Sequence, residues 1–214
     1  MTPFLLVLSA PSGGGKTTIA KALIAAREDV GYSVSATTRP PRAAERDGVD
    51  YHFITFEEFV RRVKAGAFLE WAEYGGHRYG TLAAEVERVL ASGRHVVMDI
   101  EVQGARRIRD RCQNVVSVFI IPPSAQALVD RLGGRRTERP PDLVRRLRRA
   151  VAELDEAKDY DYVVVNADRT QAVAEVAAII EAESRRPRWQ PTLDQSLAAL
   201  GRDIAERADT LERT

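Results

Sequence analysis

The stretch FLLVLSAPSGGGKTTIA, residues 4–20, constrains the fold more than any other part of the sequence. Its first five residues are apolar, a run too short for a helix and typical of one buried strand. Three consecutive glycines would destabilise the interior of a helix or strand, so Gly13, Gly14 and Gly15 predict a tight loop. A helical pattern follows Lys16. A strand, a glycine loop and a helix in this order predict an anion-binding pocket made of backbone N–H groups.

The spacing of this stretch predicts a nucleoside triphosphate site. The P-loop pattern is a glycine, four residues and then Gly-Lys-Ser/Thr, and here Ala10 stands at the leading position. Alanine fits there if its φ is negative. Lys16 is expected to reach the β- and γ-phosphates, and the Thr17 hydroxyl to hold Mg²⁺. A glycine-rich turn with an incidental lysine is the alternative. The expected ATP-binding residues of the loop are Ala10, Pro11, Ser12, Gly13, Gly14, Gly15, Lys16, Thr17 and Thr18.

Composition narrows the class of protein. A chain of 214 residues buries one good core, and a net charge of +1 provides no field for nucleic acid or a membrane. The single Cys112 excludes an internal disulfide and suits a reducing cytoplasm. No run reaches the roughly 20 apolar residues of a membrane span, and the N-terminus lacks a signal-peptide pattern. Three scattered histidines and one cysteine form no zinc motif, so Mg²⁺ carried by the nucleotide is the expected metal.

Apolar runs alternate with helical patterns along most of the chain, which predicts an α/β fold with a parallel sheet flanked by helices on both faces. We expect buried strands at residues 95–100, 115–121 and 162–166, and helices at residues 81–93, 104–112, 124–132 and 170–186. The predicted P-loop NTPase-type core comprises residues 1–32, 81–130 and 150–186.

Three segments lie outside this alternation. Residues 33–80 contain short polar strands, such as YSVSATT and FLEWAEY, around the small helix FEEFVRRVKAG, and predict an inserted lobe with its own mixed sheet. Residues 131–149 are dense in arginine and predict a helical lid. Residues 187–214 predict an appended amphipathic helix that packs on the core or on another subunit. Its apolar stripe is Leu193, Leu197, Leu200, Ile204 and Leu211.

Four polar residues have strand or loop contexts that suit a binding site. Arg39 and Arg42 are three apart in a proline-stiffened segment, so both guanidinium groups can face one phosphate. A solvated loop is the alternative. Glu70, in an otherwise apolar strand, either meets a partner or is an edge charge facing water. Asp99 ends a strand at the sheet edge where α/β folds bind ligands, although it could also form a turn.

The arginine-dense segment has three interpretations: a nucleic-acid surface, a solvated helix face or a lid over phosphates. A nucleic-acid groove would be expected to contain interleaved aromatic residues, and this segment has none. A lid that brings charge to a transferring phosphoryl group fits better. Its arginines are Arg131, Arg135, Arg136, Arg139, Arg145, Arg146, Arg148 and Arg149.

Taken together, these motifs resemble the guanylate kinase family, whose members phosphorylate GMP to GDP with ATP. The motifs lie in the family's order between about residues 5 and 180: SAPSGGGKTT, SVSATTRPPR, DGVDYHF, FLEWAEY, YGT, DIEVQGA, RLGGRRT and VVVNAD. Arg136 and the pair Pro140-Pro141 depart from the family's lid pattern. The resemblance implies a Mg²⁺-dependent ATP:GMP phosphotransferase of purine metabolism in the cytoplasm.

The resemblance also implies residue roles. Two arginines and two tyrosines would bind the phosphate of GMP, whereas Ser35, Glu70 and Thr81 would read guanine. Asn166 and Asp168 would lie beside the base of ATP. The implied GMP-binding residues are Ser35, Arg39, Arg42, Tyr51, Glu70, Tyr79, Thr81 and Asp99. The implied catalytic residues are Lys16, Arg39, Arg42, Arg131, Arg135 and Arg146.

Three rival functions would leave different patterns in the sequence. A GTPase switch would require Asn-Lys-x-Asp, which the sequence lacks. A kinase for another small phosphorylated substrate would not require the guanine-reading set. A non-catalytic guanylate-kinase-like binding module would be free to lose the phosphate cradle, which is intact at Lys16 and Thr17.

Overall fold

The computed structural model describes residues 2–133 and 140–212. The chain divides into two compact units, one of residues 3–177 and one of residues 178–214 together with the first two residues. The larger unit contains the P-loop, the lobe and the described part of the lid segment. Arg135, Arg136 and Arg139 lie outside the described residues.

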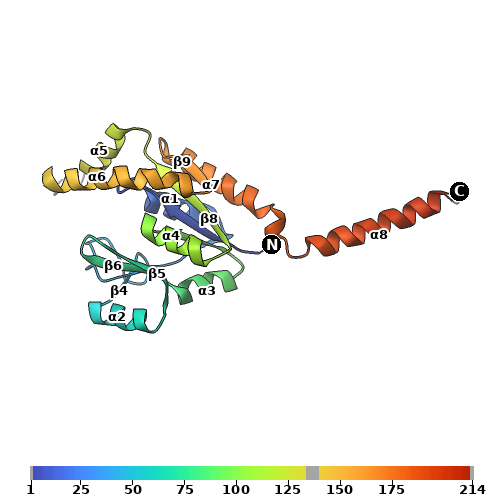
Figure 1. Ribbon diagram of the computed structural model, residues 1–214, viewed down its shortest axis with the longest axis horizontal. Helices are drawn as coiled ribbons and strands as arrows, with labels where there is room; N and C mark the ends of the chain where they lie inside the picture. The colour runs from blue at the N-terminus through green and yellow to red at the C-terminus, as the bar shows by residue number, and fades with distance from the viewer. Residues whose placement is uncertain (1, 134–139, 213–214) are drawn as a thin grey trace. The chain divides into compact units, whose positions relative to one another are not determined.

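A parallel sheet of five strands forms the centre of the larger unit (Figure 1). Its order is β2-β7-β1-β8-β9, and β1 pairs in parallel with both β7 and β8. Because parallel strands end at the same edge, the loop after β1 lies next to the loop after β7. Leu8 is in register with Asp99 there. The strands are β1 (Leu5–Ser9), β2 (Val30–Tyr32), β7 (His95–Asp99), β8 (Val115–Ile121) and β9 (Tyr162–Val165).

Helices cover both faces of this sheet, as the sequence predicts. Leu5 and Val7 of β1 join an apolar cluster with Val86 of α3 and Ile108 of α4. Leu6, which lies between Leu5 and Val7 in β1, points to the other face of the sheet. Helix α1 packs on that face with its buried Ile19. The helices of this unit are α1 (Lys16–Ala26), α2 (Phe56–Lys64), α3 (Ala83–Ala91), α4 (Val102–Arg111), α5 (Ala125–Gly133), α6 (Pro140–Asp155) and most of α7 (Arg169–Ser184).

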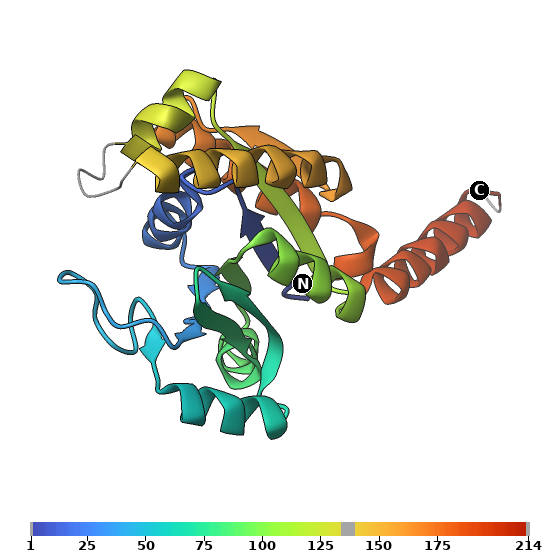
Figure 2. The same ribbon diagram turned by 60° about the vertical axis from the view of Figure 1, so that its left-hand side comes forward.

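The predicted lobe has its own mixed sheet of four strands in the order β4-β3-β6-β5 (Figure 2). Helix α2 packs on it through Phe59, whose ring stacks on that of Phe68 at 4.5 Å between centroids. Thr55 caps this helix, since its hydroxyl accepts the N–H of Glu58 at 3.2 Å. The strands are β3 (Ala36–Thr37), β4 (His52–Phe53), β5 (Phe68–Tyr74) and β6 (His77–Leu82).

Three predictions of local structure are wrong in detail. The stretch YSVSATT is not one strand, because Tyr32 ends β2 of the main sheet and β3 begins at Ala36. The helix predicted from residue 81 begins at Ala83, since the two residues before it belong to β6. The strand at 162–166 is not buried throughout, because β9 is an edge strand and Val163 and Val165 are 49% and 46% exposed.

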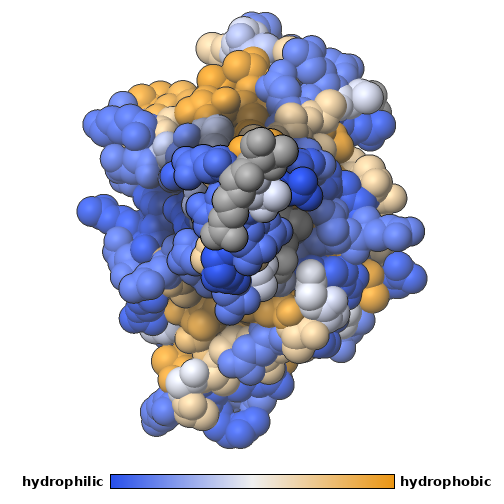
Figure 3. Space-filling view, turned by 90° about the vertical axis from the view of Figure 1, so that its right-hand side faces the viewer, coloured by the Kyte–Doolittle hydropathy of each residue, from blue (hydrophilic) through white to orange (hydrophobic). Residues whose placement is uncertain are grey.

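The smaller unit consists of the end of α7, a 3₁₀ turn at Pro187–Trp189 and α8 (Leu193–Glu212). Trp189 is buried, and its indole N–H donates to Glu183 at 3.4 Å. The stripe on α8 is exposed, with exposures of 55–59% at Leu197, Leu200 and Ile204. On the side of the molecule drawn in Figure 3, hydrophilic residues predominate and hydrophobic residues gather in separate patches.

No helix in the described ranges 2–133 and 140–212 has the length and apolar content needed to cross a bilayer.

Candidate active site

The P-loop owes its conformation to glycines that other residues could not replace. Gly13 and Gly15 have φ values of +86° and +97°, and α1 begins directly after Gly15. A Cβ on Gly14 would lie 2.7 Å from the Cβ of Ala10, so alanine at the leading position makes glycine necessary at residue 14. No non-glycine residue in the described part of the chain has a positive φ, so Ala10 meets the condition predicted for it.

Asn166, predicted to lie beside the ATP base, holds the P-loop by a hydrogen bond to its backbone. Its side-chain N–H donates to the carbonyl of Gly14 at 2.9 Å, across 152 residues of sequence. A Cβ on Gly15 would lie 2.5 Å from the same nitrogen, which is a second reason for glycine there. The backbone carbonyl of Asn166 accepts a guanidinium N–H of Arg131 at 2.7 Å. Asp168 is exposed and accepts the N–H of Gln171 at the start of α7.

Charged and hydroxyl groups meet where β1 and β7 end. The Lys16 ammonium lies 2.9 Å from a carboxylate oxygen of Glu101. Burial opposes the charge of Lys16, but Glu101 and Asp99 outweigh it and raise the pKa of the lysine. The Thr17 hydroxyl donates to one oxygen of Asp99 and the Tyr32 hydroxyl to the other, both at 2.5 Å. The Lys16 ammonium and the side-chain oxygens of Thr17 and Asp99 therefore lie together beside the P-loop.

Glu70 is buried, with 4% of its surface exposed, so the interpretation as an edge charge facing water is wrong. One of its oxygens accepts both the hydroxyl of Thr81 at 2.7 Å and its N–H at 3.2 Å. Burial raises the pKa of this carboxyl group, and the bonds from Thr81 only partly offset the effect. Gly104 of α4 makes room for the other oxygen, which lies 2.6 Å from the position that a Cβ would take.

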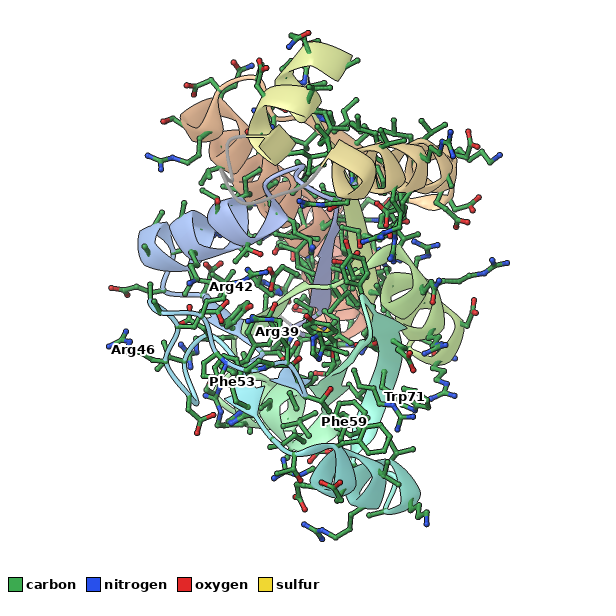
Figure 4. All side chains as sticks on the ribbon, turned by 90° about the vertical axis from the view of Figure 1, so that its left-hand side faces the viewer. Arg39, Arg42, Arg46, Phe53, Phe59 and Trp71 are labelled. Carbon is green, nitrogen blue, oxygen red and sulfur yellow. The ribbon has the colours of Figure 1, made fainter. Side chains whose placement is uncertain are left out.

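Arg39 and Arg42 lie on the side of the lobe that faces α1, whereas Phe59 and Trp71 lie farther from that helix (Figure 4). Glu45 holds the two arginines together, because it accepts a guanidinium N–H of Arg39 at 2.8 Å and the backbone N–H of Arg42 at 2.8 Å. Both arginines line one cavity.

One cavity of about 440 Å³ joins these groups. Its wall includes the P-loop, the lobe, the end of β7 and helix α6. Thr81 contacts Glu70 but does not line the cavity. Arg131 does not line it either, and its guanidinium binds the backbone carbonyl of Asn166. Seven predicted ATP-site residues also do not line the cavity: Ala10, Pro11, Gly14, Gly15, Thr18, Asn166 and Asp168. The other described predicted residues do line it, and they are Ser12, Gly13, Lys16, Thr17, Ser35, Arg39, Arg42, Tyr51, Glu70, Tyr79, Asp99 and Arg146.

Several residues of this wall have no predicted role. Glu101 lies in the motif DIEVQGA and has no predicted role, although its place just after the end of β7 indicates one. Tyr74 also lines the cavity, and no local pattern marks it, whereas Arg149, another wall residue, belongs to the predicted arginine-dense segment. Glu45 has no predicted role either, because an acidic residue a few positions after two arginines in a loop is usually a surface charge.

Comparisons with known proteins agree with this geometry. The sequence model of the family described as guanylate kinase matches residues 3–183. The chain belongs to the guanylate kinase family.

Relatives support membership of the guanylate kinase family over most of the chain. A guanylate kinase from Symbiobacterium thermophilum is 50% identical over 182 residues, which are 85% of this chain and 86% of that protein. One from Chelativorans sp. is 45% identical over 206 residues, 96% of this chain and 93% of that protein. A crystal structure of guanylate kinase from Anaplasma phagocytophilum superposes with a TM-score of 0.72 at 33% identity, covering 87% of this chain and 88% of that one.

Proposed function

We propose that this chain transfers the terminal phosphoryl group of ATP to GMP and releases ADP and GDP, within cytoplasmic purine metabolism. The observation that carries the proposal is a single cavity with a phosphate cradle at Lys16 and Thr17 and a buried carboxylate at Glu70. The cradle suits the phosphates of a nucleotide, and the carboxylate suits the N1–H and amino group of guanine. Family membership supports the same substrates.

Guanine recognition follows from the geometry of Glu70. Its two oxygens have about four lone-pair sites, and Thr81 uses two of them. The remaining sites, with the oxygen that faces Gly104, are left for the two donors of guanine. Because Thr81 holds the carboxylate, Ser35 on the cavity wall is the better candidate to donate to the guanine carbonyl. Adenine has no proton on N1, and it would leave this charge unmatched.

The transfer itself requires no general base, because the attacking oxygen of GMP is already anionic. Arg39 and Arg42 would bind the accepting phosphate, and Arg146 of α6 would approach the transferring group from the opposite wall. Lys16 would exchange Glu101 for the β- and γ-phosphates. Positioning and charge neutralisation would then provide most of the rate. We expect Arg131 and Arg135 to assist from the lid segment.

The residues at the mouth of the P-loop fit a magnesium ion. No group of three or more His, Cys, Asp or Glu suited to a metal occurs in the described ranges, so a protein-only site is not indicated. Mg²⁺ prefers oxygen ligands and keeps several waters. Thr17 would hold the ion and Asp99 would act through water, and the ion would supply charge neutralisation for the phosphates of ATP.

We also propose the division of labour among segments. Residues 1–32, 81–130 and 150–186 would form the ATP-binding core, residues 33–80 the GMP-binding lobe, and residues 131–149 the lid. Closure of lobe and lid would exclude water and prevent hydrolysis of ATP.

The segment 187–214 is proposed to bind a second copy of the chain through α8. Isolated helices of this size are marginal in water, and its leucines are exposed. Leu200→Lys should shift the molecular mass measured by light scattering towards the monomer, whereas Ala199→Lys, about 100° away around the helix, should not. An unchanged mass in Leu200→Lys would contradict this proposal.

A direct assay tests the main proposal. ADP release is coupled to NADH oxidation and measured with ATP and GMP, AMP, CMP or UMP in turn. We expect turnover with GMP and at least about 100-fold lower kcat/KM with AMP. Binding of GMP without turnover would favour the non-catalytic module, and turnover with a different acceptor would favour another small-substrate kinase.

A further inference from the structure

Three parts of the larger unit meet at Ser12 of the P-loop. The backbone N–H of Ser12 donates to one oxygen of Glu153, on α6, at 3.0 Å. Its hydroxyl oxygen accepts the hydroxyl of Tyr74, at the end of β5, at 3.3 Å and a guanidinium N–H of Arg146, on α6, at 3.1 Å. Ser12 is buried, with 7% of its surface exposed. One residue of the phosphate cradle thus contacts both the lobe and the lid-side helix.

Arg149 closes these contacts into a ring. Its guanidinium donates to the second oxygen of Glu153 at 2.8 Å and lies 3.8 Å from the centre of the Tyr74 ring. The ring of contacts therefore runs from Tyr74 to Arg149, to Glu153, to Ser12 and back to Tyr74. Cation–π and charge-assisted contacts of this kind are strongest when they are shielded from water. Glu153 is 7% exposed, so its contacts with Ser12 and Arg149 are shielded from water.

The position of Tyr74 relates this ring to the lobe's ligand. Tyr74 follows Glu70 by four residues on β5, so both side chains lie on the same side of the strand. Both line the cavity, with about 13 Å of strand between them. A ligand that fixes Glu70 also fixes the strand that carries Tyr74. The phenol then restricts Ser12, at the other end of the cavity.

We propose that Tyr74 is a positioning residue that couples occupancy of the lobe to the geometry of the P-loop through Ser12, Arg149 and Glu153. The inference rests on the proposed function, since it takes GMP as the ligand of the lobe and ATP as that of the P-loop. GMP should therefore tighten the binding of ATP, and ATP should tighten the binding of GMP by the same factor.

The test measures this factor by titration calorimetry. The dissociation constant of GMP is determined without and with a saturating non-hydrolysable ATP analogue and Mg²⁺. We expect a ratio of at least about fivefold in the unmodified protein, within the usual range of coupling between two sites. Tyr74→Leu should bring the ratio to within about twofold of unity, while GMP affinity without the analogue changes less than about threefold.

Two further variants separate coupling from a loss of fold. Tyr74→Phe keeps the aromatic ring under Arg149 and removes the hydrogen bond to Ser12, so it should lower the ratio by an intermediate amount. Glu153→Gln keeps the shape of the side chain and weakens its bonds to Ser12 and Arg149. It should lower the ratio without any change in the lobe. Glu73→Gln, the exposed neighbour of Tyr74 on the same strand, is the matched control and should keep the full ratio.

The outcomes are distinguishable. A ratio below about twofold in the unmodified protein overturns the inference, and so does a full ratio in Tyr74→Leu. Loss of GMP affinity in Tyr74→Leu to the same degree with and without the analogue would identify Tyr74 as a plain contact residue and also overturn it. If the unmodified protein bound no GMP at all, the proposed function itself would fail, before any variant was made.

Discussion

The two ends of the cavity carry their charges in different ways. At the P-loop, the Lys16 ammonium lies 2.9 Å from Glu101, and nearby carboxylates raise its pKa in spite of burial. In the lobe, the buried carboxylate of Glu70 accepts its bonds from Thr81, a neutral donor, and burial raises its pKa. The P-loop end is therefore built to exchange one ionic partner for another. The lobe end is built to receive neutral N–H donors, so shape and hydrogen bonding should matter there more than charge.

The largest expected effect tests the P-loop end of this comparison. Lys16→Met removes a cation that would act mainly on the transferring phosphates, so kcat should fall between about 100-fold and 1,000-fold. GMP affinity measured without ATP should stay unchanged, because the lobe is intact. Lys64→Met, at an exposed position on α2, is the control and should keep normal turnover. Near-normal kcat in Lys16→Met would remove the phosphate-cradle assignment.

The next effect tests the lobe end. Glu70→Gln keeps one acceptor for Thr81 and replaces the other with a donor, which opposes the donors of guanine. We expect kcat/KM for GMP to fall about 100-fold while the KM for ATP barely moves. Steady-state kinetics with both nucleotides measure this, with Glu73→Gln as the exposed control on the same strand. If Glu70→Gln left GMP kinetics unchanged, guanine would be read elsewhere.

A smaller effect tests shape alone. In Gly104→Ala, the new Cβ would lie 2.6 Å from an oxygen of Glu70 and 3.0 Å from its carboxyl carbon, so the carboxylate must shift. We expect about a tenfold weaker affinity for GMP, since overpacking of this kind costs about 1–3 kcal/mol. The affinity for an ATP analogue should not change.

Gly201→Ala provides the control for this helix substitution, because its Cβ would meet no atom within 4 Å. It should leave both affinities unchanged. An unchanged GMP affinity in Gly104→Ala would mean that Glu70 has more freedom than its packing indicates.

The same contrast explains what the sequence could reveal. The P-loop was predictable because its glycines, Lys16 and Thr17 are contiguous, and their backbone demands are local. Asn166 supports that loop from 152 residues away, and its contact with Gly14 left no local signal. The parallel sheet and the lobe were predictable from alternating patterns of residues. The exposure of β9 was not, since an apolar run does not reveal whether its strand lies at the sheet's edge.

In the lobe, prediction reached residue types but not their surroundings. Glu70 stood out as a carboxylate in an apolar strand, yet two interpretations stayed open until Thr81 and Gly104 were seen around it. Tyr74 and Glu153 meet Ser12 across 62 and 141 residues. Such contacts depend on how segments pack, and a single sequence does not contain that information.

The smallest effect uses pH to separate the two ends. Burial raises the pKa of Glu70 above its ordinary 4.5, so the folded chain keeps this proton at pH values where the unfolded chain has lost it. Stability therefore falls as pH rises from about 4.5 through the raised pKa of the folded state. Glu70→Gln lacks this fall, so its melting temperature should exceed that of the unmodified protein by a margin that grows from pH 4 to pH 8.

Other titrating groups leave this margin unchanged. Lys16 adds no slope in this pH range, because a lysine whose pKa is raised stays charged throughout it. Glu153 titrates in both proteins and cancels from the difference. Thermal melts at each pH measure the gap, with Glu73→Gln as the exposed control on the same strand. A gap that is constant with pH would mean that Glu70 is not destabilised by its burial, and the contrast between the two ends of the cavity would be lost.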